Sequence, residues 1–278
     1  MMSLGLEGKT ALVTGASRGI GRAIAHALHA EGVGLALVAR SQQGLQDTLR
    51  SLQSVGGSPE ASATRATQKT AGAPVHLLTA DLALASEIER VAHEAIAQLG
   101  HVDILINNAA QARNGLFFEM SDAELQTVWQ VKGIGYVRMV RAIVPHMREH
   151  GGGRILNIAG DTARTPRADF IVGSMVNAAL VNFTRGIARE LAGYNIRVNA
   201  ISPGWTLTEN LQRSFELRAN AQGITVDELM QREARGLPLK RLVTMEEIAA
   251  LAAFVVSDRC PALTGEDIAI DSGATPGV

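Results

Sequence analysis

The fold is decided by a glycine-rich stretch near the N-terminus, which reads Thr14-Gly15-Ala16-Ser17-Arg18-Gly19-Ile20-Gly21. It follows an apolar run and precedes a helical pattern. Gly15 permits a tight turn, Gly19 lets the backbone approach a pyrophosphate, and Gly21 allows the helix to pack closely on a sheet. The N-terminus of such a helix presents free N–H groups and a positive dipole end to phosphates. In this strand–turn–helix context the glycines predict a nucleotide site made by Gly15, Ser17, Arg18, Gly19, Ile20 and Gly21.

Outward from this turn, short apolar runs alternate with longer helical patterns. The runs that predict strands are residues 10–14, 34–39, 75–79, 102–106, 154–158, 196–201 and 267–270. The patterns that predict helices are residues 20–31, 84–99, 121–150, 173–192 and 245–257. Ser121 and Glu124 form a capping box at the start of the third helix. Apolar strands that alternate with helices predict a Rossmann-like α/β fold, a doubly wound parallel sheet in a three-layer α/β/α arrangement.

Two stretches interrupt this alternation. Residues 56–74 are rich in Gly, Ser, Ala and Thr, which predicts an inserted surface loop. Residues 211–237 are polar with a helical composition and follow a Pro-Gly turn, a position suited to a lid over a ligand crevice. Because there is no internal repeat and no interdomain linker, we expect residues 1–278 to form a single domain.

The composition excludes several classes of function. The net charge is −1 and aromatic residues make up 4% of the 278 residues, which argues against nucleic acid or an anionic membrane as partner. The longest fully apolar run, residues 248–256, is far shorter than a membrane span. One cysteine rules out an internal disulfide, and the seven histidines show no metal-binding spacing. We therefore expect a cytoplasmic protein without a metal.

The end of the second predicted strand indicates which dinucleotide is bound. An acidic residue there would bind the 2′-hydroxyl of NAD, whereas an arginine suits the 2′-phosphate of NADP. The residues that follow this strand are Arg40 and Ser41, and Arg18 lies in the same predicted crevice. Since guanidinium groups pair well with phosphates, we predict NADP(H) in preference to NAD(H).

Further motifs follow the glycine turn in order. They are Asp81-Leu82, Asn107-Asn108-Ala109-Ala110, Ser202-Pro203-Gly204 with Thr208, and Leu263-Thr264-Gly265 with residues 268–273. Together with residues 14–21, they resemble the motifs of the short-chain dehydrogenase/reductase family over nearly the whole chain. The resemblance implies that Asp81 holds the adenine amino group and that Thr208 contacts the nicotinamide amide. It adds Leu82, Asn108, Ala109, Pro203 and Gly204 to the predicted cofactor-binding residues.

The catalytic positions depart from the family pattern. The family carries Asn, Ser, Tyr and Lys, and the resemblance places these positions at Lys132, Gly160, Gly173 and Asn177. In the family the Tyr hydroxyl moves the proton, the Lys lowers the pKa of that hydroxyl and binds the ribose, and the Ser polarises the carbonyl. Glycine provides none of these groups, so we also expect a roomier pocket.

Lysine stands where the family has Asn, and Asn stands where it has Lys. One hypothesis is that Lys132 and Asn177 have exchanged places and keep an ammonium near the ribose; the alternative is drift after loss of catalysis. Candidates for the missing acid are Asp161, Ser174, Thr162 and Tyr136. Each also has a purely structural interpretation, such as capping or packing. Solvent or the substrate itself remains an alternative source of the proton.

Three functions remain open at this point. The first is an NADP(H)-dependent oxidoreductase that acts on a small carbonyl or alcohol by a non-standard proton route. The second is a weak or inactive NADP(H)-binding sensor or structural protein, and the third is a lyase. Arg164 and Arg167 are either ligands for an acidic substrate or solvated loop residues, and Trp205 either lines the pocket or anchors the lid. The resemblance also implies a homotetramer or homodimer built on the third and fourth predicted helices.

Overall fold

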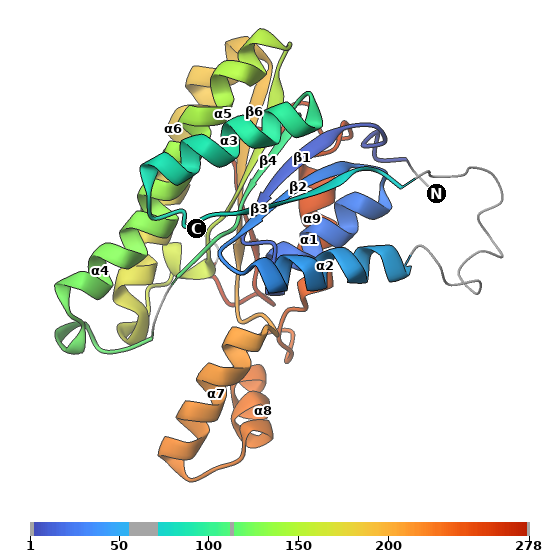
Figure 1. Cartoon of the computed structure of the whole chain (residues 1–278). Coiled ribbons are helices and arrows are strands. Elements are labelled where there is room, and N and C mark those ends of the chain that lie inside the picture. The colour runs from blue at the N-terminus through green and yellow to red at the C-terminus, as the bar shows by residue number, and fades with distance from the viewer. Residues whose placement is uncertain (1–2, 56–71, 112–113, 277–278) are drawn as a thin grey trace.

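A parallel sheet of seven strands forms the centre of the computed structural model, which describes residues 3–55, 72–111 and 114–276 (Figure 1). The strands are β1 (Thr10–Thr14), β2 (Gly34–Ala39), β3 (Val75–Thr79), β4 (Ile104–Asn107), β5 (Gly153–Ile158), β6 (Ile196–Pro203) and β7 (Asp267–Ile270). Their order is β3-β2-β1-β4-β5-β6-β7, so the winding reverses between β1 and β4. This arrangement confirms the predicted doubly wound Rossmann-like fold.

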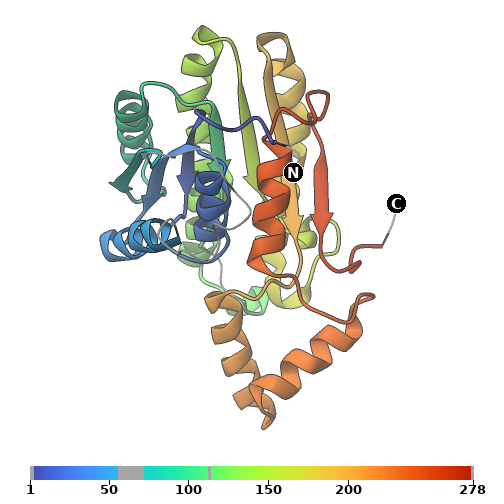
Figure 2. The ribbon, with the colours of Figure 1, turned by 90° about the vertical axis from the view of Figure 1, so that its right-hand side faces the viewer.

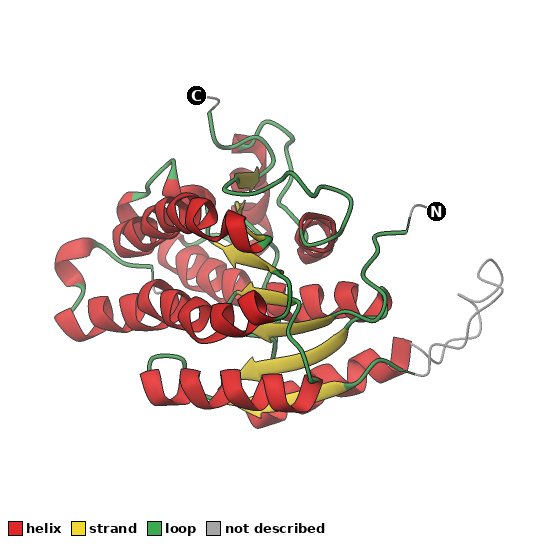
Figure 3. Ribbon diagram, turned by 90° about the horizontal axis from the view of Figure 1, so that it is seen from above, coloured by secondary structure: helices red, strands yellow, loops and turns green. Residues whose placement is uncertain are grey.

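Helices cover both faces of the sheet (Figures 2 and 3). The α-helices are α1 (Gly19–Ala30), α2 (Gln42–Val55), α3 (Ala85–Leu99), α4 (Asp122–Val128), α5 (Gly135–Glu149), α6 (Ile171–Leu191), α7 (Glu209–Gln222), α8 (Val226–Gly236) and α9 (Met245–Val255). Short helical turns are η2 (Phe117–Glu119), η3 (Trp129–Ile134), η4 (Asp161–Ala163), η5 (Ala168–Phe170) and η6 (Ala192–Tyr194). Apolar residues of α1, α2 and α9 pack on one face, and those of α3, α5 and α6 on the other.

The strands are apolar on both sides because both sheet faces are covered. In β1, Ala11 and Val13 belong to the core under α1 and α9, whereas Leu12 belongs to the core under α3 and α5. The register aligns Leu12 with Ala36 of β2 and Leu105 of β4, so one row of side chains crosses the sheet. The continuous apolar runs of the sequence reflect this two-sided burial.

Two helical regions differ from the prediction. Helix α2 is not predicted, because it is polar and, among its residues 42–54, buries only the side chains of Leu45, Thr48 and Leu52 against the fold. The predicted helix over 121–150 is divided into α4, the π-helical turn η3 and α5. The capping box of Ser121 and Glu124 at the start of α4 is confirmed.

The two interruptions of the alternation have different outcomes. Most of the predicted inserted loop, residues 56–71, lies outside the described residues. The predicted helical stretch over 211–237 corresponds to α7 and α8, which project from the carboxyl end of the sheet (Figure 1). These helices have a small core of their own around Phe215 and Leu229. A lid function for α7 and α8 stays a prediction.

One segment of the described chain passes a length and composition test for a membrane span. It is Ala168–Tyr194, with a mean hydropathy of 1.3 in its most apolar window. This segment contains α6, which packs against β6 and buries Val176, Leu180 and Val181. The core of the fold therefore explains the apolar side chains on the buried face of this helix.

Candidate active site

A cleft of about 1170 Å³ opens at the carboxyl ends of β1 and β4, where the strand order reverses. In doubly wound folds this is the place where ligands bind. Of the predicted cofactor residues, those that line the cleft are Gly15, Ser17, Arg18, Gly19, Ile20, Arg40, Ser41, Asp81, Leu82, Asn108, Ala109, Pro203, Gly204 and Thr208. Gly21 lies behind them, in the first turn of α1.

The glycine turn has no room for a side chain at Gly15 or Gly21. Gly15 and Gly19 have φ angles of +68° and +58°, in the region that favours glycine. A Cβ on Gly15 would lie 2.8 Å from the Cα of Ala109, and a Cβ on Gly21 would lie 2.3 Å from the carbonyl oxygen of Gly15. The turn therefore forms a cradle at the N-terminus of α1, the kind of place in which backbone N–H groups bind phosphate.

Asn108 and Thr14 join the ends of β1 and β4 across the cleft floor. The Asn108 side-chain amide donates to the Thr14 carbonyl oxygen at 3.0 Å, and the Asn108 backbone N–H donates to Thr14 Oγ1 at 2.9 Å. Thr14 Oγ1 also accepts from the N–H of Ala109 at 3.1 Å. These bonds hold the two strand ends in a fixed relative position.

Two exposed arginines, Arg18 and Arg40, stand at the rim of the cleft. Arg40 donates to Gln111 Oε1 at 3.1 Å, a surface contact that water or a phosphate can replace. Ser41 Oγ accepts from the N–H of Gly44 at 3.0 Å and caps the start of α2. The rim is thus cationic and is bounded by a second helix N-terminus, which the sequence analysis did not predict.

The other predicted cofactor residues hold the walls of the cleft. Asp81 Oδ1 accepts from the N–H of Ala83 at 3.0 Å, and Thr208 Oγ1 accepts from the N–H of Leu211 at 3.2 Å and caps α7. A Cβ on Gly204 would lie 2.7 Å from the Cβ of Asp271, so this position also requires glycine.

Lys132 lines the cleft from the π-helical turn η3. Its ammonium donates to the Ala159 carbonyl oxygen at 2.8 Å, and burial lowers the pKa of Lys132 to about 8. A π-helical turn inside a longer helix often marks a functional site. Here a Cβ on Gly133 would lie 2.7 Å from the ring of Trp129, so the glycine next to Lys132 allows this turn.

Asn177 closes the space beside Gly160. Its side-chain amide donates to Thr162 Oγ1 at 2.9 Å, and a Cβ on Gly160 would lie 2.6 Å from the same nitrogen. The Asn177 Oδ1 atom is buried and has no hydrogen-bond partner within the described chain. Because such an atom costs free energy, it is a candidate acceptor for a ligand hydroxyl.

The expectation of a roomier pocket is wrong at Gly173. A Cβ there would lie 2.1 Å from the ring of Phe170, so this ring takes the space that a side chain at 173 would fill. Phe170 itself lines the cleft. The sequence analysis did not identify it, because an aromatic residue three positions before a glycine carries no signal of its own.

Asp161 presents a carboxyl group in the cleft. The pKa of Asp161 is raised to about 6, chiefly by burial and to a smaller extent by nearby Asp271, while Arg167 and the backbone N–H of Thr162 lower it. The two oxygens of Asp271 are held by the N–H groups of Gly273 at 2.9 Å and Thr275 at 2.7 Å. Asp161 is therefore a carboxyl group that exchanges protons near neutral pH.

Two candidates for the missing acid do not reach the cleft. Ser174 is buried, and its hydroxyl donates to the Phe170 carbonyl oxygen at 2.8 Å within α6. Tyr136 is also buried, its hydroxyl faces the Ile158 carbonyl oxygen at 3.4 Å, and burial raises its pKa above the ordinary value. Neither residue lines the cleft, so both have structural roles.

The two arginines around Pro166 both have partners within the protein. Arg164 pairs with the buried carboxylate of Asp267 at 3.0 Å and fixes the loop to β7. Arg167 lines the cleft, with its guanidinium 4.0 Å from the centre of the Trp205 ring. Its Nε lies 3.4 Å from Asp169. Arg167 and Trp205 thus form a cationic and aromatic wall opposite the glycine turn.

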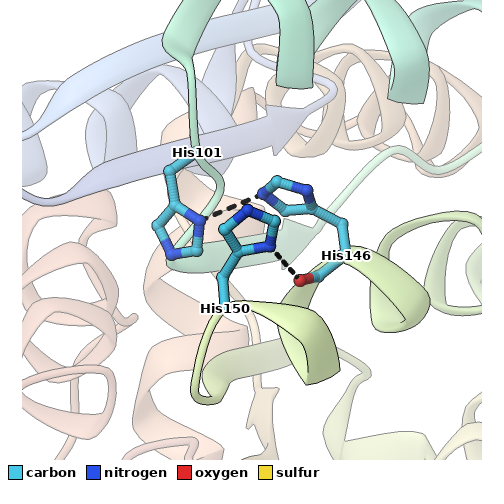
Figure 4. A group of neighbouring side chains, drawn as sticks. All are labelled: His101, His146 and His150. Carbon is cyan, nitrogen blue, oxygen red and sulfur yellow. Dashed lines mark hydrogen bonds between the residues drawn. The ribbon is translucent and has the colours of Figure 1, made fainter.

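The structure places three histidines close together, which the sequence analysis did not predict. His146 and His150 are one helical turn apart, and His101 is distant from both in the sequence. The fold brings the three side chains together (Figure 4), near the amino-terminal ends of β4 and β5. The four-residue spacing of His146 and His150 indicates in the sequence that these two side chains are close. The proximity of His101 becomes visible only in the fold.

Comparisons with known proteins find relatives that match nearly the whole chain. A family model described as enoyl-(acyl carrier protein) reductase matches residues 15–275. The chain is 31% identical to 2,3-dihydro-2,3-dihydroxybenzoate dehydrogenase of Bacillus subtilis over 100% of both chains. It is 30% identical to an NADPH-dependent reductase of Bacillus subtilis over 96% of this chain and 97% of that protein. The crystal structure of L-sorbose reductase from Gluconobacter frateurii with NADPH and L-sorbose has a TM-score of 0.90, 31% identity and 100% coverage of both chains.

Proposed function

The chain belongs to the short-chain dehydrogenase/reductase family, and from that premise we propose that it is an NADP(H)-dependent oxidoreductase of a carbonyl or alcohol substrate with Asp161 as its proton-exchanging group. The observation that carries the proposal is the position of Asp161. Its carboxyl group, with a pKa raised to about 6, lies in the same cleft as the glycine turn. General acid–base catalysis works best when the pKa lies near the operating pH.

The residues present fit NADP(H). The cradle at Gly15, Gly19 and Gly21 would receive the pyrophosphate, and Arg18 and Arg40 at the rim would meet the 2′-phosphate. The crystal structure of L-sorbose reductase contains NADPH, and one relative is an NADPH-dependent reductase. The other predicted cofactor residues that line the same cleft are Ser17, Ile20, Ser41, Asp81, Leu82, Asn108, Ala109, Pro203, Gly204 and Thr208.

We propose that the family's catalytic positions are Lys132, Gly160, Gly173 and Asn177 in this chain. The exchange of Lys and Asn is supported by two contacts with the loop after β5. The Lys132 ammonium donates to the Ala159 carbonyl oxygen, and the Asn177 side chain lies beside Gly160. An ammonium at Lys132 and the free Oδ1 of Asn177 would bind ribose hydroxyl groups. Both contacts would orient the cofactor without a catalytic tyrosine.

When bound, NADP(H) supplies or accepts the hydride. Asp161 would hold a proton at its carboxyl group and donate it to the carbonyl oxygen during reduction, or accept it during alcohol oxidation. Burial raises the pKa of Asp161 most, Arg167 lowers it and Asp271 raises it, so burial and these two neighbours together affect the proton affinity of the group. Helices α7 and α8 would act as a lid that excludes water around this transfer.

A second candidate function is an NADP(H)-binding sensor or structural protein. The observation that favours it is the filling of the catalytic region, because Phe170 covers Gly173 and Asn177 covers Gly160. A substrate would then have less room beside the nicotinamide. The triple variant Phe170→Ala, Gly173→Tyr, Asn177→Lys restores two family groups and the space for them. In a sensor this variant would gain carbonyl reduction from a background of none.

Absorbance at 340 nm separates the two functions. The protein is mixed with NADPH and a panel of ketones, quinones and aldehydes at pH 6, and NADPH consumption is compared with that of Asp161→Asn. Turnover that depends on Asp161 supports the oxidoreductase. NADPH binding with no turnover on any substrate supports the sensor, and turnover unchanged in Asp161→Asn refutes the proposed proton route.

We also propose that the protein is cytoplasmic and forms a homotetramer or homodimer through α5 and α6. The half-exposed side chain of Met175 on α6 supports an apolar contact on this helix. Sedimentation analysis of the wild type and Met175→Lys tests the assembly. A smaller species for Met175→Lys supports this interface, and a wild-type monomer refutes it.

A further inference from the structure

Three histidines, His101, His146 and His150, lie together (Figure 4). They are close to the amino-terminal ends of β4 and β5, whereas the cleft lies at the carboxyl ends of the strands. His101 lies between α3 and β4, just after Gly100, whose left-handed conformation ends α3. His146 lies in the last turn of α5, and His150 is its C-cap. One metal-binding atom from each ring lies within 4.8 Å of the other two.

The fold and the sequence spacing create this cluster together. Residues four apart on a helix share a face, so His146 and His150 point the same way, and their ring centres are 4.0 Å apart. The loop before β4 then places His101 Nδ1 at 3.0 Å from His146 Nε2. Two nitrogen ligands of a tetrahedral zinc ion are about 3.3 Å apart, given Zn–N bonds of about 2.0–2.1 Å. His101 Nδ1 and His146 Nε2, at 3.0 Å, are already close to this separation.

In His150 and His101, one ring nitrogen lies beside a carbonyl or carboxylate oxygen, as is common for metal-bound histidines. His150 Nδ1 donates to the His146 carbonyl oxygen at 2.8 Å, which leaves the lone pair on Nε2. His101 Nε2, the ring nitrogen that does not contact His146, lies 3.4 Å from Asp103 Oδ1. Asp103 is itself fixed, because its Oδ2 accepts from the N–H of Thr10 at 2.9 Å. A carboxylate or carbonyl behind the imidazole fixes the tautomer and strengthens the ligand.

We propose that His101, His146 and His150 bind one divalent transition-metal ion of the zinc type, with water as the fourth ligand. Imidazole nitrogens suit Zn²⁺, Cu²⁺ and Ni²⁺, whereas Mg²⁺ and Ca²⁺ prefer oxygen. The ion would join the loop before β4 to the end of α5, since the three ligands come from these two segments. It lies at the edge opposite the cleft, so its role is to stabilise the fold.

The test uses tag-free, full-length protein that has been treated with a chelator. Titration with Zn²⁺ is followed by calorimetry, and titration with Co²⁺ by its visible absorption, which reports four-coordinate geometry. We expect one ion per chain and a Tm that rises with free Zn²⁺, because a ligand that binds only the folded state stabilises it. His150→Ala and His146→Ala should each weaken binding by at least about 10-fold.

His93→Ala is the matched control, because His93 is an exposed histidine on the neighbouring helix α3. It should leave Zn²⁺ affinity and the rise in Tm unchanged. Because His150 is exposed, His150→Ala should fold even if His146→Ala does not. Absence of saturable binding by the wild type would overturn the proposal. The same is true if binding persists unchanged in His150→Ala, or if His93→Ala weakens it equally.

Discussion

Replacement of Asp161 by Asn removes the proton that the proposed mechanism requires and changes little else in shape. The Asp161 carboxyl lies in the cleft. Burial is the main reason that its pKa is raised from an ordinary value of 3.8 to about 6. With this pKa, about half of the protein carries the proton at pH 6 and about 1% at pH 8. If the protonated group is the acid, kcat/KM for carbonyl reduction should fall about 50-fold between pH 6 and pH 8.

Asp161→Asn should lower kcat/KM by about 100-fold or more at pH 6, the range typical of a lost general acid, and should abolish the pH dependence. The assay is initial-rate NADPH oxidation at 340 nm from pH 5.5 to 8.5, corrected for spontaneous decay. Asp122→Asn, at an exposed position at the start of α4, is the control that should keep the wild-type profile. A wild-type pH profile in Asp161→Asn would refute the reasoning, because another group would then carry the proton.

The same substitution has a predicted effect on stability. The folded-state pKa of Asp161 lies above the unfolded value, so its contribution to stability is complete below pH 3.8 and is lost as the pH rises through about 6. Above pH 6 the wild type therefore carries a partly buried, charged carboxylate at Asp161, which is unfavourable. Asp161→Asn has a neutral amide in its place. Asp161→Asn should have the higher Tm at pH 8, and the difference should shrink as the pH falls toward 4. A constant difference across this range would mean that burial does not perturb this carboxyl group.

Three further predictions follow from the geometry of the cleft. Gly21→Ala places a methyl group 2.3 Å from a carbonyl oxygen of the turn, so it should lower stability by about 1–3 kcal/mol and weaken NADPH binding, as measured by thermal unfolding and fluorescence titration. As the control for this substitution, Gly236→Ala at the end of α8, where a Cβ would meet no atom within 4 Å, should be neutral or slightly stabilising. Arg40→Ala should weaken NADPH about 10- to 100-fold and leave NADH nearly unchanged; equal losses for both would remove Arg40 from the 2′-phosphate site. Lys132→Met should raise the Tm at pH 7 because the folded-state pKa is lowered to about 8 from 10.5, and the gain should shrink as the pH rises from 8 toward 10.5; a gain that does not change with pH would contradict the buried ammonium.

Much of the fold was predictable because the strands are buried on both faces. Four strands, β1, β2, β3 and β7, begin and end where their apolar runs predict. Helix α2 was not predictable in the same way, since it buries only a few side chains and its polar sequence resembles a loop. The π-helical turn around Lys132 was also missed, because glycines at 133 and 135 signal a close approach but not its geometry.

The site was predictable where backbone shape decides it and not where side chains from separate segments meet. The glycine turn follows from steric rules that act within a few residues, and its φ angles agree with them. The ring of Phe170 over Gly173 depends on how the loop before α6 folds back, and the approach of His101 to His146 depends on the sheet order. Long-range contacts of this kind leave no periodic pattern in the sequence.

The binding of NADP(H) in the cleft between β1 and β4 is tested most directly by titration of the wild-type protein with NADPH and NADH, followed by calorimetry. The basic rim and the glycine turn predict one site per chain, with NADPH bound about 10- to 100-fold more tightly than NADH. Absence of saturable binding by either dinucleotide would contradict the proposed oxidoreductase and the proposed sensor together. Tighter binding of NADH would contradict the role of Arg18 and Arg40.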